Sequence, residues 1–129
     1  FIDGHLLLIS RDGNLSALSW PKGAVLWSDP DAEAVGVVPM EDTVLVSTRT
    51  GGLEHRSLTN EILWRYEAES PAMTPPIVHK LNACFVTQEG WVHSVDASTG
   101  KGKFKIQLGS IAATPSAKDG ILLLPERSG

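Results

Sequence analysis

The sequence lacks several features that define particular classes of protein. It has one cysteine, Cys84, in 129 residues, which excludes an internal disulfide framework and a metal cluster made of cysteines. It has no apolar run near the roughly 18 residues that a membrane-spanning helix needs. Basic residues are fewer than acidic ones, 11 against 15, whereas a nucleic-acid binder usually presents a basic face. We therefore expect neither a nucleic-acid partner nor a direct membrane span.

Motifs of catalysis and of metal or cofactor binding are also missing. The stretch Thr99–Lys103 contains Gly-Lys but lacks the earlier glycine of a phosphate-binding loop, so we interpret it as a hairpin turn. His55 and His93 stand four and three residues after Gly51 and Gly90. On equivalent strands their side chains would face opposite sides, which argues against a shared metal site. The sequence predicts no catalytic residue, no cofactor and no metal.

What the sequence does contain is a repeat of about 39 residues. An apolar run, a short polar stretch and a glycine recur in this order four times, and the glycines are Gly13, Gly51, Gly90 and Gly129. Their spacings are 38, 39 and 39 residues. The first three glycines are followed, after 13 or 14 residues, by the aromatics Trp27, Trp64 and Phe104. A period this steady indicates a repeat architecture.

Each repeat is interpreted as four short strands. The first carries Thr-Pro in two repeats, at Thr74-Pro75 and Thr114-Pro115; the second is the apolar run, the third follows the glycine, and the fourth ends at the aromatic. Such runs, bounded by Gly, Asp and Asn, are typical of strands joined by hairpin turns, and no helical periodicity is present. The predicted fold class is all-β, a β-propeller of four-stranded antiparallel blades.

The recurring glycine and aromatic each have a predicted mechanical role. The turn after the second strand is tight, and glycine is the residue that most easily adopts a positive φ there. The aromatic on the fourth strand is expected to pack between adjacent blades, which have no core of their own until they are stacked.

Two stretches carry a resemblance to a known family. Asp96–Lys101 reads Asp-Ala-Ser-Thr-Gly-Lys and is followed by Phe104, and Gly13–Leu18 is followed by Val25-Leu26-Trp27. These residues resemble the repeat of quinoprotein-like (PQQ-like) propellers, and the resemblance extends over nearly the whole chain. The second repeat departs from the pattern, with Arg56 where its siblings have leucine or valine. Irregular repeats of this kind are typical of the non-enzymatic members.

The resemblance implies several alternative functions. Quinoprotein alcohol dehydrogenases bind pyrroloquinoline quinone and calcium, and they would imply a vicinal cysteine pair that this stretch lacks. The scaffold lipoprotein of outer-membrane barrel assembly uses similar blades without a cofactor. We expect a non-catalytic scaffold for protein–protein interaction of this second kind, periplasmic or otherwise extracytoplasmic. A dehydrogenase fragment and a regulatory or tail propeller of a larger enzyme are the alternatives.

The repeat also predicts the domain organisation. At about 39 residues a blade, residues 1–129 amount to about 3.3 blades, whereas propellers usually have four to eight. We therefore expect residues 1–129 to be a segment of one propeller domain. The remaining blades would come from the same longer chain or from other subunits.

Loops between blades are the predicted partner-binding site, because blade packing occupies the strands. Residues 29–33 and 67–71 join the fourth strand of one blade to the first strand of the next, whereas the third equivalent loop, at Gly109-Ser110, is uncharged. Equivalent loops should lie side by side on one face. The predicted site is an acidic patch for a basic partner, with a merely solvated loop face as the alternative; it consists of Asp29, Asp31, Glu33, Glu67 and Glu69.

Overall fold

The computed structural model describes residues 4–108, 116–118 and 121–123. Within these ranges the chain forms strands and no helix. The strands are β1 (His5–Ile9), β2 (Leu15–Ser19), β3 (Val25–Asp29), β4 (Ala34–Pro39), β5 (Thr43–Thr48), β6 (Gly52–Ser57), β7 (Ile62–Glu67), β8 (Ile77–His79), β9 (Asn82–Val86), β10 (Trp91–Asp96), β11 (Gly102–Gln107), β12 (Ser116–Lys118) and β13 (Ile121–Leu123). Gly129 and the Thr114-Pro115 pair lie outside the described residues.

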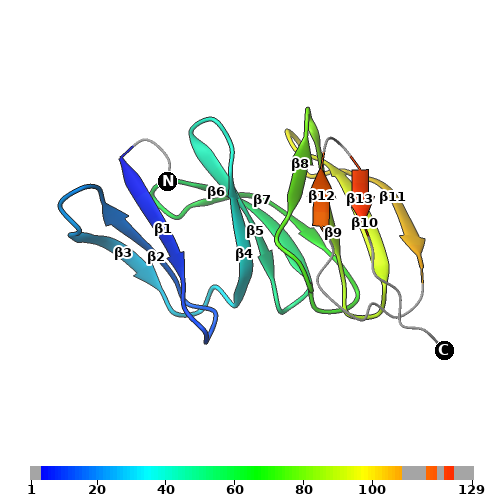
Figure 1. The fold of residues 1–129 in the computed structure, drawn as a ribbon, viewed down its shortest axis with the longest axis horizontal. Coiled ribbons are helices and arrows are strands. Elements are labelled where there is room, and N and C mark those ends of the chain that lie inside the picture. Colours follow the sequence, from blue (N-terminus) through cyan, green and yellow to red (C-terminus); the bar gives the residue numbers. More distant parts are fainter. Residues whose placement is uncertain (1–3, 109–115, 119–120, 124–129) are drawn as a thin grey trace.

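The strands form antiparallel sheets in which each strand pairs with its sequence neighbour. The sheets are β1-β2-β3, β4-β5-β6-β7, β8-β9-β10-β11 and β12-β13, and we call the first three blades 1, 2 and 3. The three blades stand side by side in chain order (Figure 1). The all-β propeller fold predicted from the repeat is confirmed.

The repeat is visible in the strand registers as well as in the sequence. The pairing of the third and fourth strands shifts by one residue immediately before the recurring aromatic in each blade. The residue left out of register is Leu26, Leu63 or Lys103. A bulge at the same place in three blades shows that they are copies of one structural unit.

The turn glycines adopt the conformation that the sequence predicts. Gly13, Gly51 and Gly90 have φ values of 88°, 93° and 84°, in the left-handed region that glycine enters at least cost. A Cβ on Gly51 would also lie 2.8 Å from the carbonyl oxygen of Ala68. The absence of a side chain therefore lets this turn lie directly against the loop that leaves β7.

The hydrophobic core lies between the blades. One cluster joins blades 1 and 2 and contains Leu15, Ala32, Ala34, Val44 and Val46. A second cluster joins blades 2 and 3 and contains Leu45, Leu53, Ala72, Ala83, Phe85, Val95 and Ala97. Each blade therefore depends on its neighbour to bury its apolar face, as in other repeat architectures.

Two of the three recurring aromatics pack at blade interfaces as predicted. Trp27 packs against the first cluster, and its Nε1 donates a hydrogen bond to the Leu58 carbonyl of blade 2 at 2.8 Å. Trp64 packs against the second cluster and lies so close to Gly100 of blade 3 that a Cβ there would be 2.6 Å from its ring. Phe104 differs, because its side chain is 53% exposed. The described residues after β11 form only the pair β12 and β13. They include no third or fourth strand of a following blade that could cover Phe104.

The first strand of blade 3 is shorter than the sequence suggested. The repeat pattern places Thr74-Pro75 in this strand, but β8 starts at Ile77, because Pro75 and Pro76 have no N–H with which to pair. Thr74 is buried and connects blades instead: its Oγ1 accepts a hydrogen bond from the Val86 amide, and its carbonyl accepts one from the Ser47 hydroxyl.

Candidate functional site

The two predicted loops lie on the same face of the structure. The connections from β3 to β4 and from β7 to β8 are both at the lower edge of the blades in Figure 1. Equivalent hydrogen bonds hold them: the Arg49 amide donates to the Glu33 carbonyl at 2.8 Å, and the Gln88 amide donates to the Pro71 carbonyl at 3.0 Å. We call this edge the loop face.

Asp29, the first predicted site residue, is fixed by the neighbouring blade. Its side chain is 21% exposed, and its Oδ2 accepts hydrogen bonds from Arg56 Nη1 at 2.8 Å and Asn60 Nδ2 at 3.1 Å. Burial acts to raise its pKa, but the bonds from Arg56, Asn60 and the Asp31 amide outweigh burial and hold the pKa below its usual value. Asp29 is therefore a charged anchor between blades 1 and 2.

A buried ion-pair network continues from this anchor. Arg56 Nη2 donates to Glu54 Oε1 at 2.6 Å, and the Glu54 side chain is only 3% exposed. The other Glu54 oxygen accepts a hydrogen bond from Arg65, whose Nε also donates to Glu67 Oε1 at 2.5 Å. Glu67, another predicted site residue, is thereby held against an arginine of its own strand.

The remaining three predicted acids differ in their surroundings. Glu33 has a φ of 53° and lies 3.9 Å from Arg49, measured from Oε2 to Nη1. Asp31 is exposed and has no ion pair among the described residues. Glu69 Oε2 lies 3.6 Å from His93 Nε2.

His93 is a neutral neighbour for Glu69. Its ring is buried, stacks on Phe85 with centroids 5.2 Å apart, and hydrogen-bonds through Nδ1 with the Tyr66 hydroxyl at 2.8 Å. Burial lowers the pKa of His93, and the nearby Glu69 carboxylate only partly opposes this. The charge of Glu69 is therefore not offset by an imidazolium at neutral pH.

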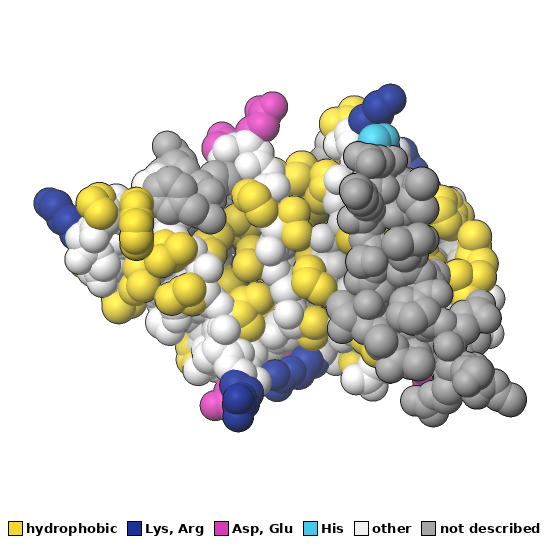
Figure 2. All heavy atoms as spheres, viewed as in Figure 1, with side chains coloured by type: hydrophobic (Ala, Val, Ile, Leu, Met, Phe, Trp, Pro, Cys, Tyr) yellow, Lys and Arg dark blue, Asp and Glu magenta, His cyan; other side chains and the backbone are white. Residues whose placement is uncertain are grey.

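The sequence prediction identified the acids but not the arginines that pair with them. Arg49, Arg56 and Arg65 each lie within 4 Å of one of the predicted carboxylates, and Figure 2 shows basic side chains beside acidic ones at the lower edge. One signal was present, since Arg56 replaces an apolar residue of the sibling repeats. Two predicted acids, Asp31 and Glu69, have no arginine partner among the described residues.

Neither a metal site nor a membrane span emerges from the described part of the chain. No three His, Cys, Asp or Glu side chains of these residues come together where they could hold a metal ion. Likewise, none of these residues forms a helix long and apolar enough to cross a membrane.

A family model and a curated relative match this chain under the same description. Residues 11–126 match the family described as "Outer membrane protein assembly factor BamB". The protein of that name from Escherichia coli is 23% identical over 140 aligned residues, which cover 99% of this chain and 34% of that protein. The chain thus spans about a third of the length of this relative.

Solved structures share the fold. BamB from Moraxella catarrhalis superposes with a TM-score of 0.75 at 23% identity, over 96% of this chain and 41% of that one. The quinohemoprotein alcohol dehydrogenase from Comamonas testosteroni gives a TM-score of 0.67 at 18% identity, over 81% of this chain and 19% of the enzyme. At these identities the likeness establishes the propeller fold, which proteins of very different function share.

Proposed function

Because the chain belongs to the family of the outer membrane protein assembly factor BamB, we propose that it is part of a propeller scaffold that holds other proteins together during outer-membrane protein assembly. The observation that carries this proposal is the family match over residues 11–126. The proposal places the protein on the periplasmic side of the outer membrane and gives it no catalytic reaction.

The alternative is a fragment of a quinoprotein dehydrogenase, a class of enzyme that shares the propeller fold. Cys84 is the single cysteine, and burial raises the pKa of its thiol, so this stretch offers neither a vicinal pair nor a reactive thiolate. Absorption spectra of the full-length protein after addition of pyrroloquinoline quinone and calcium separate the two functions. The scaffold proposal expects no bound-cofactor band, and such a band would establish the dehydrogenase.

We also propose that residues 1–129 are a segment of a larger propeller. Trp27 and Trp64 are each covered by a turn of the following blade, whereas Phe104, Ile106 and Leu108 are exposed large apolar side chains. A further blade would cover these side chains as blade 3 covers Trp64. It would be supplied by the same longer chain or by another subunit.

The loop face is the proposed partner site. It carries the five predicted acids Asp29, Asp31, Glu33, Glu67 and Glu69, and ion pairs anchor Asp29, Glu33 and Glu67. Asp31 and Glu69 leave their negative charge to the solvent side, which suits a basic partner surface. The ion pairs hold Asp29, Glu33 and Glu67 against arginines before any partner binds, which reduces the ordering entropy that these side chains lose on binding.

Crosslinking in the bacterial envelope tests the proposed function. A photoreactive amino acid replaces Asp31 in the full-length protein, and a matched variant carries it at Lys22, an exposed residue in the turn between β2 and β3. The scaffold proposal expects the Asp31 position to crosslink to proteins that assemble the outer membrane, with little product from the Lys22 position. Crosslinks only to unrelated abundant proteins would contradict it.

A further inference from the structure

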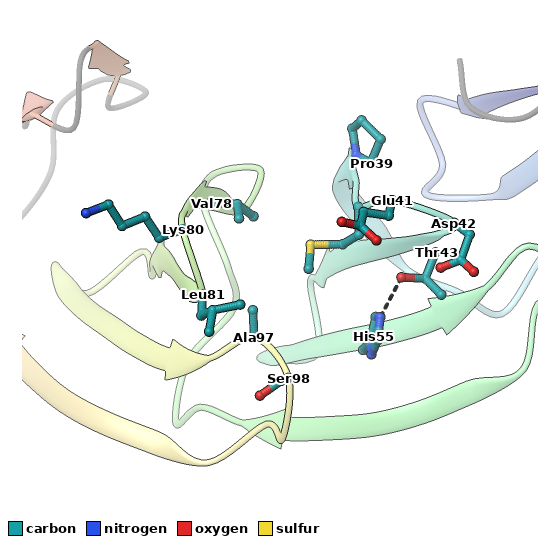
Figure 3. Close-up of a pocket in the computed structure, with 11 residues that line it drawn as sticks. Pro39, Glu41, Asp42, Thr43, His55, Val78, Lys80, Leu81, Ala97 and Ser98 are labelled. Carbon is teal, nitrogen blue, oxygen red and sulfur yellow. Dashed lines mark hydrogen bonds between the residues drawn. The ribbon is translucent and has the colours of Figure 1, made fainter.

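A cavity of about 550 Å³ opens between blades 2 and 3 (Figure 3). The turns that line it are at the edge opposite the loop face (Figure 1). Blade 2 contributes the turn between β4 and β5 together with His55, and blade 3 contributes two turns that face it. The side chains that matter below are Met40, Glu41, Asp42, Val78, Leu81 and Ala97.

The cavity has a cause in the repeat. Leu58 and Ala97 both stand seven residues after a turn glycine, but Leu58 packs into the interface of blades 1 and 2, whereas Ala97 offers a single methyl group to the interface of blades 2 and 3. The turn after Ala97 is also one residue longer, since Asp96 bonds to Lys101 where Ser57 bonds to Glu61. The second interface therefore leaves open space that Leu58 fills in the first.

The longer turn changes the contact made by the tryptophan as well. Gly100 lies against Trp64, and the buried Nε1 of Trp64 has no hydrogen-bond partner among the described residues, whereas Trp27 Nε1 bonds to the Leu58 carbonyl. The tryptophan N–H in the interface between blades 2 and 3 therefore lacks the hydrogen bond that its counterpart makes between blades 1 and 2.

The walls of the cavity are mainly apolar. Met40 lies on one side, and Val78, Leu81 and Ala97 lie on the other. Leu81 is 65% exposed, so an apolar side chain stands at the mouth with much of its surface in water. An aliphatic ligand that covered it would gain free energy from the apolar area removed from water.

The polar groups give the cavity a negative side. Glu41 and Asp42 come from the blade 2 turn, and neither is in an ion pair within the described residues. The side chain of Lys80 lines the blade 3 side, but its ammonium points away from blade 2 (Figure 3). Burial lowers the pKa of His55, which hydrogen-bonds with Thr43, and Asp42 only partly opposes this. His55 therefore adds no positive charge at neutral pH.

We propose that this cavity binds the side chain of a lysine or arginine on an extended segment of a partner protein. The aliphatic stem lies against Met40, Val78 and Leu81, and the cation meets the carboxylates of Glu41 and Asp42. Long basic side chains combine an apolar stem with a charged end in this way. The inference rests on the proposed function, because the segment belongs to a protein that the scaffold holds.

A small probe tests the cavity without any partner. Methyl groups of Met40 and Ala97 are followed by NMR in the full-length protein during titration with Nα-acetyl-lysine methylamide. The norleucine analogue, which lacks the ammonium, is the control ligand. The lysine probe should shift both methyl signals and bind about fivefold more tightly than the norleucine probe, as expected for a partly exposed ion pair.

Three variants sharpen the test. Ala97→Leu restores the side chain found at position 58 and should abolish binding, and Glu41→Gln with Asp42→Asn should lower the affinity for lysine to that for norleucine. Glu61→Gln, at an exposed turn outside the cavity, should change nothing. The inference is overturned if lysine binds no better than norleucine, or if folded Ala97→Leu binds as the wild type does. If Ala97→Leu fails to fold, the Glu41→Gln and Asp42→Asn variant still decides the test, because the inference is overturned if that folded variant keeps its preference for lysine.

The probe titration and the envelope crosslinking test different claims. Failure of the envelope crosslinks with intact probe binding would overturn the proposed function alone. Absence of probe binding with intact crosslinks would overturn only the cavity.

Discussion

Tyr66 of blade 2 and His93 of blade 3 form a hydrogen bond of 2.8 Å across the interface between their blades. In the neighbouring interface, Asp29 of blade 1 accepts a hydrogen bond from Arg56 of blade 2. Tyr66 and Asp29 each stand two residues after the recurring tryptophan. One position of the repeat therefore fastens successive blades together, by a neutral pair in one interface and a charged pair in the other.

The neutral bridge gives a first prediction. Tyr66→Phe removes the hydroxyl and leaves buried His93 without its Nδ1 partner, so the free energy of unfolding should fall by about 1–3 kcal/mol. Urea denaturation of the wild type and the variant measures the difference. An unchanged midpoint would show that the bridge does not contribute to stability.

The histidines predict a pH dependence. The pKa values of His93 and His55 are lowered in the folded state, so the unfolded chain binds more protons once the pH falls below the usual histidine value of about 6.5. The stability that the two neutral histidines contribute is fully present above that pH. It is lost as the pH falls from about 6.5 toward their lowered folded-state pKa values. The pKa of Asp29 is also lowered, so Asp29 changes the free energy of unfolding only at about pH 4 and below.

The measurement is the free energy of unfolding between pH 7.5 and 5.5 for the wild type and His93→Gln. The wild type should lose stability as the pH falls, and the variant should lose less. Equal slopes in the two proteins would contradict the assignment of His93 as a buried neutral base.

The charged bridge predicts a large effect at Arg56. Arg56→Leu installs the side chain of the first repeat but removes the guanidinium that bonds to Asp29 and to one Glu54 oxygen, and breaking a buried pair in this way costs about 3–5 kcal/mol. Arg65 is then the remaining cation beside Glu54, so adding Glu54→Leu removes a poorly compensated buried charge and should recover part of the loss. Chemical denaturation of both variants checks this, and a single variant as stable as the wild type would refute the role of the network.

The two tryptophans predict a contrast. Trp64→Ala should cost about 3–5 kcal/mol because Trp64 packs against the core between blades 2 and 3. Trp27→Phe should cost more than Trp64→Phe, by about 1 kcal/mol, because only Trp27 Nε1 has a hydrogen-bond partner among the described residues. Equal losses for the two phenylalanine variants would mean that the bond to Leu58 is not a stabilising difference.

The features that recur with the repeat could be predicted from the sequence. Gly13, Gly51 and Gly90 mark turns because a positive φ selects glycine, and Trp27 and Trp64 mark the interfaces because each blade needs a neighbour to bury its apolar face. These properties depend on local conformation and on apolar spacing, and both can be read along the chain.

The features that differ between repeats could not be predicted so well. Arg49 and Arg56 meet predicted acids only because segments from separate parts of the chain come together, and sequence spacing does not report such distances. The start of β8 at Ile77 differs from the repeat pattern because Pro75 and Pro76 cannot donate hydrogen bonds to a neighbouring strand. The cavity beside Ala97 exists because alanine is smaller than the leucine at the equivalent position 58, and its location depends on how the blades pack together.

The central claim is that the loop face binds a basic partner, and the affinity of a charge-reversed variant tests it most directly. Asp31→Lys with Glu69→Lys leaves the anchoring ion pairs in place, and Lys22→Glu, in the exposed turn between β2 and β3, is the charge-reversal control. The account predicts that the double variant keeps its circular dichroism spectrum and loses affinity for the crosslinked partner by at least about tenfold, while the control binds as the wild type does. Undiminished affinity of the folded double variant would contradict it.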